Sequence, residues 1–171
     1  MQKKLKPQDV LVIVKILLWE EKSWSIGSLA ESINLSKSET HAAIKRCDFA
    51  GLYNPISKKP IKSALEEFLL HGVKYVFPVV PGAISRGIPT AHSSKPMSEF
   101  IESDDNDDQY VWPYENGKIR GISIAPLYVS VPEAALKDQK LYELLSLLDC
   151  LRIGKAREII IAQKEIKKKL K

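Results

Sequence analysis

Small and apolar positions recur at helical spacing in the stretch from residue 25 to residue 52. Those that form the buried stripe follow the i, i+3, i+4, i+7 pattern: Thr40, Ala43, Ile44 and Cys47. Ser36 lies before this run, and Glu39 comes three residues after Ser36. This spacing predicts a capping box at the start of the helix. Gly51 comes after the run, where helices commonly end in a left-handed residue. The pattern therefore predicts a helix with a defined start and a defined end.

A second helix precedes this one, and a tight turn joins the two. Ser25 is its predicted N-cap, and Asn34 lies in the connection, where a residue that tolerates positive φ is favoured. Further upstream, residues 8–20 are apolar almost all round, which is typical of a helix buried on two sides. We expect the helix-turn-helix to cover one side. A second subunit or the C-terminal helices should cover the other.

The middle of the chain has a different texture. Residues 73–77 are β-branched and aromatic and predict a strand. Residues 78–96 are rich in Pro, Gly and Ser, and they predict an ordered loop that wraps the surface. Asn116-Gly117 lies between the strand-like residues 110–112 and 118–124 and predicts a β-hairpin. Because two strands alone are marginal, the hairpin is expected to join the strand at 73–77 in a small antiparallel sheet.

Helical periodicity returns near the C-terminus. Leucines recur at helical spacing from residue 141 to residue 151, and a second helix over residues 156–170 leads into a basic tail. The whole pattern predicts an α+β protein with three regions. These are a helix-turn-helix domain (1–72), Pro-rich loops with a small β-sheet (73–132), and C-terminal helices available for dimerisation (133–171).

Composition adds a modest basic bias. The chain of 171 residues is 44% hydrophobic and carries a net charge of +5. Residues 1–63 hold 11 Lys and Arg against 6 Asp and Glu, residues 64–132 hold 5 against 9, and residues 133–171 hold 10 against 6. Basic charge therefore lies at both ends, around an acidic middle that includes a predicted exposed loop at 99–108. Such a balance permits a nucleic-acid partner without requiring one.

The helix that follows Ser36 carries short polar and basic side chains on the face opposite its buried stripe. A helix of this kind fits the major groove of DNA. The residues expected to reach base edges share that face: Ser38, His41, Ala42 and Lys45. The residues expected to contact phosphates lie around it: Ser25, Ser36, Lys37, Arg46, Lys58 and Lys59.

Residues 8–20, the segment LAESINLSKSETHAAIKR and the closing Gly51-Leu52 resemble the winged helix-turn-helix domain of bacterial transcription regulators, MarR-like ones among others. The resemblance covers residues 8–53, under a third of the chain. It implies three helices followed by a two-stranded wing with a basic loop. The chain departs most from this pattern at the wing, because Asn54-Pro55 and Lys59-Pro60 interrupt it, so a very short wing is expected.

Together these features predict sequence-specific binding of double-stranded DNA by a transcription regulator, expected to be a repressor. A homodimer is expected, since two-fold symmetry lets paired helices read two half-sites. The alternative is a protein-interaction adaptor, or an antitoxin-like partner of a second protein, that uses the acidic middle region. Salt dependence separates the two, because binding through phosphates weakens steeply as salt rises.

Enzyme and metal-site motifs are not found in the sequence. Its histidines and cysteines lack metal-ligand spacing, and it has neither a nucleophile elbow nor a phosphate-binding glycine loop. No catalytic residue, metal or cofactor is therefore predicted. A candidate site for a small-molecule effector or protein partner comprises Arg86, His92, Trp112 and Arg120, whose aromatic surroundings could equally be the core of the small sheet.

The two cysteines, Cys47 and Cys150, fall in predicted helices and are expected to be reduced core residues. The basic start of the chain is followed by a helical apolar run without a cleavage site, so no signal peptide is predicted. No apolar run reaches the roughly 20 residues that span a bilayer. A cytoplasmic protein without a membrane partner is expected.

Overall fold

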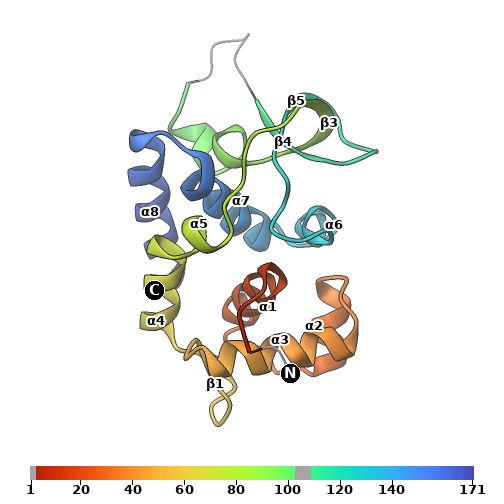
Figure 1. Ribbon diagram of the computed structural model, residues 1–171, viewed down its shortest axis with the longest axis vertical. Helices are drawn as coiled ribbons and strands as arrows, with labels where there is room; N and C mark the ends of the chain where they lie inside the picture. Colours follow the sequence, from red (N-terminus) through yellow and green to blue (C-terminus); the bar gives the residue numbers. More distant parts are fainter. Residues whose placement is uncertain (1–2, 103–108) are drawn as a thin grey trace.

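The structure, a computed structural model, describes residues 3–102 and 109–171. Its helices are α1 (Pro7–Leu18), α2 (Ile26–Ser32), α3 (Lys37–Phe49), α4 (Lys62–His71), α5 (Val73–Val76), α6 (Val131–Lys137), α7 (Gln139–Ile153) and α8 (Ala156–Leu170), with the short 3-10 helices η1 (Ala91–Ser93) and η2 (Met97–Glu99). Its strands are β1 (Tyr53–Asn54), β2 (Lys59–Pro60), β3 (Ile84–Pro89), β4 (Tyr110–Pro113) and β5 (Ile119–Ser123). The predicted α+β class is confirmed (Figure 1).

Helix α1 lies between α3 and the C-terminal helices (Figure 1). All its residues from Val10 to Leu17 are buried, because α3 packs on one side and α7 on another. Lys15 is among them, and its Nζ donates to Asp138 Oδ2 at 2.6 Å across the junction with α7. The expectation of a helix buried on two sides is confirmed. The second cover is the chain's own α7, so α1 supplies no apolar surface for a second subunit.

Local hydrogen bonds set the starts of α2 and α3. Ser25 Oγ accepts from the Ser28 N–H at 3.1 Å, and Ser36 Oγ accepts from the Glu39 N–H at 3.1 Å, so both predicted N-caps are confirmed. Asn34, in the turn between the helices, has a φ of 54°, as its position predicted. The capping box at α3 is only half formed, because the Glu39 carboxylate binds Gln8 and Arg46 instead of the Ser36 backbone.

A two-stranded hairpin follows α3. In it, β1 and β2 pair antiparallel over two residues each. Asn54 Oδ1 accepts from the N–H groups of Ile56 and Ser57, and Lys58 has a φ of 56°, which closes a tight loop. We call residues 53–60 the wing. Its short length is the one expected from its two X-Pro steps.

The predicted strand at residues 73–77 is wrong, because Val73–Val76 forms helix α5. Val73 is fully buried. Helix α5, which follows α4 in the chain, packs against α7. A short apolar run fits a buried helical turn as well as a strand, and here the tertiary packing decides. The sheet of this region is built from other residues.

Strands β3, β4 and β5 form a small closed barrel, in which β3 pairs antiparallel with both β4 and β5, and β4 and β5 pair parallel to each other. Two predictions are therefore wrong. The Pro- and Gly-rich residues 78–96 contain a strand, and Asn116-Gly117 does not close a hairpin between β4 and β5. The glycines serve a close approach between backbones, not a tight turn. A Cβ atom on Gly87 would lie 2.0 Å from the Trp112 carbonyl oxygen, and a Cβ atom on Gly117 would lie 2.3 Å from the Gly87 carbonyl oxygen.

The barrel is attached to α7 through the buried carboxylate of Asp149. Thr90 Oγ1 and Trp112 Nε1 each donate to Asp149 Oδ2 at 2.6 Å, and Arg152 Nη1 donates to Oδ1 at 2.9 Å. Arg152 Nε also donates to the Phe77 carbonyl oxygen at 2.8 Å. The barrel thereby joins the same hydrophobic core that α1 and α7 form.

Cys47 and Cys150 are buried free thiols, as expected, and burial raises the pKa of each above its ordinary value. Part of the predicted acidic loop, residues 103–108, lies outside the described residues. Among the helices that the structure describes, none is long and apolar enough to cross a membrane.

Candidate nucleic-acid interface

Helix α3 has a buried face and an exposed face. The buried stripe is the one predicted, and Thr40 fits within it because its hydroxyl donates to the Ser36 carbonyl oxygen at 2.9 Å. The opposite face presents predicted base-contact residues to solvent. Ser38, His41 and Lys45 are exposed, whereas Ala42 is half-buried. Three of the four predicted side chains are therefore accessible to a ligand, and the fourth is only partly accessible.

The prediction that Arg46 contacts phosphate is wrong. Its side chain is buried, with Nε 2.8 Å from Asp9 Oδ2 and Nη2 2.7 Å from Asp9 Oδ1, in a bidentate pair. Nη2 also donates to Glu39 Oε1 at 2.5 Å. The Asp9 carboxylate raises the pKa of Arg46 above its ordinary value. Because Asp9 is buried on α1, it requires a cationic partner, and Arg46 meets that need instead of facing solvent.

Glu39 extends this buried network to the surface. Burial alone would raise the pKa of Glu39, but the hydrogen bonds from Arg46 and Gln8 lower it below its ordinary value. The carboxylate therefore stays ionised at neutral pH and holds the guanidinium from a second direction. Charged groups and apolar packing together therefore fix the orientation of α3 about its own axis.

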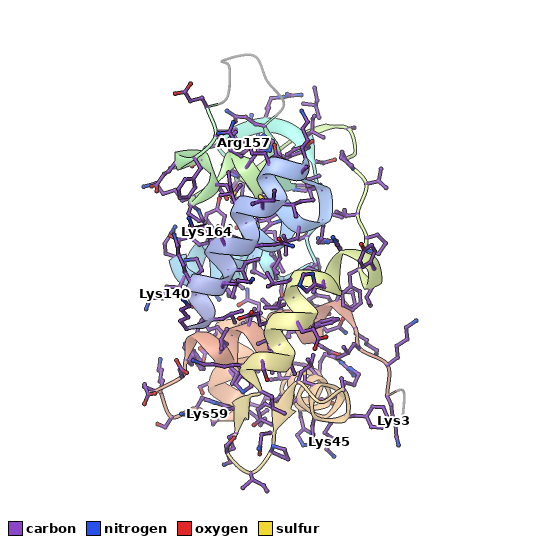
Figure 2. The ribbon with its side chains drawn as sticks, turned by 90° about the vertical axis from the view of Figure 1, so that its left-hand side faces the viewer. Lys3, Lys45, Lys59, Lys140, Arg157 and Lys164 are labelled. Atoms are coloured by element: carbon purple, nitrogen blue, oxygen red, sulfur yellow. The ribbon has the colours of Figure 1, made fainter. Side chains whose placement is uncertain are left out.

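A groove of about 410 Å³ separates α3 from the wing. Residues from three elements line it: Trp24, Ser25, Ile26, His41, Ile44, Lys45, Asp48, Tyr53, Pro55 and Lys58. The structure thus brings together predicted base-contact and phosphate-contact residues that lie up to 33 positions apart in the sequence. Lys45 and Lys59 both lie towards the lower end of the molecule in Figure 2.

The remaining predicted phosphate contacts lie around this groove. Ser25 and Ser36 are exposed N-caps, so their hydroxyl groups already accept backbone hydrogen bonds. Lys37, at the start of α3, is exposed, as are Lys58 and Lys59 on the wing. These lysines can supply charge at the two borders of the exposed face of α3.

Six groove residues were not among the predicted contacts: Trp24, Ile26, Ile44, Asp48, Tyr53 and Pro55. Asp48 is exposed on the last turn of α3, and its spacing of three from Lys45 and seven from His41 could have identified it. Trp24 and Tyr53 come from the segment before α2 and from the wing, and no local pattern connects them with α3. Asp48 introduces a negative charge beside Lys45, which makes the groove less uniformly basic than expected.

The four residues of the predicted effector site do not meet in one place. Trp112 is buried and donates to Asp149, as a buried indole N–H requires, so its assignment to a binding pocket is wrong. His92 packs edge-on against Tyr110 with ring centroids 5.0 Å apart, and its Nδ1 lies 3.8 Å from Glu158. Arg86 and Arg120 are exposed and lie opposite each other on β3 and β5.

Within residues 3–102 and 109–171, no group of three or more His, Cys, Asp and Glu side chains is placed to hold a metal ion. No protein-family model, curated protein or solved structure matches the chain.

Proposed function

We propose that the chain is a transcription regulator that binds double-stranded DNA sequence-specifically through a winged helix-turn-helix. The observation that carries this proposal is the groove between α3 and the wing, where His41 and Lys45 lie with Lys58. An α-helix with an exposed polar face can enter a major groove, and lysines beside it can hold the flanking phosphates. The buried pair of Arg46 and Asp9 supports the same proposal, because reading bases demands a rigidly oriented helix.

The roles follow from position. Ser38, His41 and Lys45 would reach base edges from the exposed face of α3, while Lys37, Lys58 and Lys59 would contact phosphates. Arg46 has a different role here, which is to orient α3. A cytoplasmic homodimer acting as a repressor remains the expected form. Because α7 covers α1, such a dimer would have to form through other surfaces of the chain.

The test is selection of preferred sites from a randomised duplex by the full chain, repeated with Lys45→Ala. Loss of a base contact should relax the preference at one or two positions, by about 1–3 kcal/mol. Lys118→Ala, an exposed lysine on the barrel, removes the same charge and is the matched control. Identical preferences for Lys45→Ala and the unaltered chain would refute base reading by α3.

A protein partner is the second candidate function, and exposed apolar residues near the groove favour it. Phe49 at the end of α3 is 63% exposed, and Ile56 at the tip of the wing is 93% exposed. Asp48 lines the same groove as Lys45. Aromatic residues are enriched in protein interfaces, and acidic ones oppose phosphate binding. A chain that does not retain any duplex at low salt would favour this function over DNA binding.

A further inference from the structure

Most of the net charge of the protein is concentrated at its C-terminal helix. Residues 155–171, which comprise α8 and one residue on either side, hold seven Lys and Arg against two Glu. Their net charge of +5 equals that of the whole chain, so the remainder of the molecule is electrically balanced. Residues 1–63 also carry a net charge of +5, so α8 and its flanking residues concentrate in 17 residues as much net charge as the first 63.

The basic residues of α8 lie on the face that does not pack. Ala162, Ile166 and Leu170 are buried, and α8 packs against α7 and α4. The cations on the opposite face are exposed: Arg157, Lys164, Lys167 and Lys171. We call these four residues the α8 stripe. From Arg157 to Lys171 the stripe runs along about 21 Å of helix, at a rise of 1.5 Å per residue.

The acidic side chains nearby do not neutralise the α8 stripe. Glu158 accepts from the Lys155 N–H at 2.8 Å, and Glu165 pairs with Lys168 at 2.6 Å. Glu143 on α7 pairs with Lys169 at 2.6 Å. In the described parts of the chain, no cation of the stripe has a carboxylate within 4.0 Å. The four charges therefore remain available to an external anion.

The lower end of the stripe adjoins the wing. Lys62 begins α4 two residues after β2, and its Nζ lies 2.5 Å from Glu20 Oε1 and 3.4 Å from the carbonyl oxygen of Lys171. Figure 2, which looks onto α8, shows Arg157 and Lys164 on this side of the molecule, with Lys59 further towards the lower end. Lys62 thus connects the end of the wing with the end of α8, and Glu20 lies beside it as the one acidic partner at this junction among the described residues.

We infer that the α8 stripe is a second binding surface for the phosphate backbone of DNA, which extends the contact beyond the bases that α3 would read. The inference rests on the proposed function, because α3 and the wing bring the duplex to the lower end of the stripe. Duplex DNA carries one negative charge per ~1.7 Å of its axis, counting both strands, so a length of ~21 Å contains about a dozen phosphates, of which those on the near side can meet the stripe. Contacts of this kind are independent of sequence and fix the path of the flanking duplex.

The test compares two variants of the full chain that lose the same charge. Arg157→Gln, Lys164→Gln and Lys171→Gln together remove three cations of the stripe, whereas Arg86→Gln, Lys118→Gln and Arg120→Gln remove three exposed cations of the barrel. Binding to a duplex of ~30 base pairs is titrated with salt. Each lost phosphate contact lowers the slope of log affinity against log salt by about 0.9, so the stripe variant should lose about 2.7. The barrel variant should keep the slope of the unaltered chain.

Duplex length supplies the second arm. On a shorter duplex that ends, on the side of the stripe, at the bases read by α3, no duplex extends along the stripe, and the stripe variant and the unaltered chain should bind almost equally. An unchanged salt slope on the long duplex, an equal loss from the barrel variant, or an equal loss on both lengths would overturn the inference. The outcome is separate from that of the Lys45→Ala selection, which reports on base reading by α3. Unchanged thermal melting of both variants establishes that they are folded.

Discussion

Asp9 on α1 and Asp149 on α7 are both buried carboxylates, yet they attach different parts of the molecule in different ways. Asp9 holds α3 through one bidentate contact with Arg46, a cation that comes from the attached helix itself. Asp149 already has a cation on its own helix, Arg152, and holds the barrel through the neutral donors Thr90 and Trp112. The polar part of the first attachment is centred on one cation, Arg46, which Asp9 and Glu39 share. The second is shared among several donors.

This difference predicts different responses to damage. Removing Arg46 leaves the Asp9 carboxylate buried without its counter-ion, which is among the costliest single changes in a protein. Removing one neutral donor from Asp149 leaves another donor on the same oxygen and the Arg152 pair intact. A single substitution in the α3 attachment should therefore cost much stability, whereas a single substitution in the barrel attachment should cost less.

The largest effect is expected from Arg46→Ala. Breaking a buried pair in this way costs about 3–5 kcal/mol of the free energy of unfolding, measured by urea denaturation. The double variant Asp9→Leu with Arg46→Met replaces the pair by apolar side chains and should recover much of that loss. A loss below about 1 kcal/mol for Arg46→Ala would show that the two attachments do not differ as described.

The junction between α1 and α7, to which both attachments connect, should depend on pH. Burial alone would raise the pKa of Asp138, but hydrogen bonds from Lys15 Nζ and the Leu141 N–H lower it below its ordinary value of 3.8. The folded protein therefore binds this proton less tightly than the unfolded chain. The stabilisation is present at neutral pH and is lost as the pH falls below about 3.8 through the folded pKa.

Asp138→Asn keeps an oxygen for the α7 cap and removes the charge opposite Lys15. We expect a loss of about 2–3 kcal/mol at pH 7 and a flatter decline of stability in acid. Thermal melting from pH 7 to about pH 2, which passes below the lowered pKa of Asp138, measures both. Asp48→Asn, at an exposed position, serves as the control and should leave the acid limb as it is. If the melting temperature of Asp138→Asn falls in acid as steeply as that of the unaltered chain, Asp138 is not the cause of the acid destabilisation.

A smaller effect is expected from Trp112→Phe. Loss of the indole N–H costs about 1–2 kcal/mol, since Thr90 still donates to Asp149 Oδ2. Amide hydrogen exchange should increase in β3, β4 and β5 and remain near its original level in α1 and α3. Equal acceleration in α1 and α3 would mean that the barrel and the helices open as one unit. Trp24→Phe, at a half-buried groove residue, controls for the change of ring.

The helices around α1 could be predicted because their signals are local. The Ser25 and Ser36 caps, the positive φ of Asn34 and the buried stripe of α3 all follow from residues within one or two turns. The shortness of the wing followed equally from its prolines. The exposure of His41 and Lys45 could also be predicted, because a helix that buries one face must present the other.

The barrel and the two attachments depend on residues far apart in the chain. The Gly87 backbone meets that of Gly117, and Trp112 finds its acceptor 37 positions later at Asp149. Arg46 was assigned to phosphate for the same reason, since the sequence does not show that Asp9 is buried beside it. Local patterns therefore predict which face of α3 is exposed. They do not predict which of its charged residues is required inside the protein.

The smallest expected effect compares two local predictions: the N-cap at Ser36, which the structure contains, and the hairpin turn at Asn116-Gly117, which it does not. Ser36→Ala removes a formed N-cap and should cost about 1 kcal/mol. Asn116→Ala should change stability by less than about 0.5 kcal/mol, because Asn116 is exposed and has no positive φ. A two-residue hairpin turn of type I′ would need positive φ at both Asn116 and Gly117, and there a change to alanine would be clearly destabilising. Urea denaturation of the two variants side by side makes the comparison. A loss at Asn116 equal to that at Ser36 would mean that the turn carries a conformational preference that the barrel uses, and the strand pairing of β4 and β5 would have to be reconsidered.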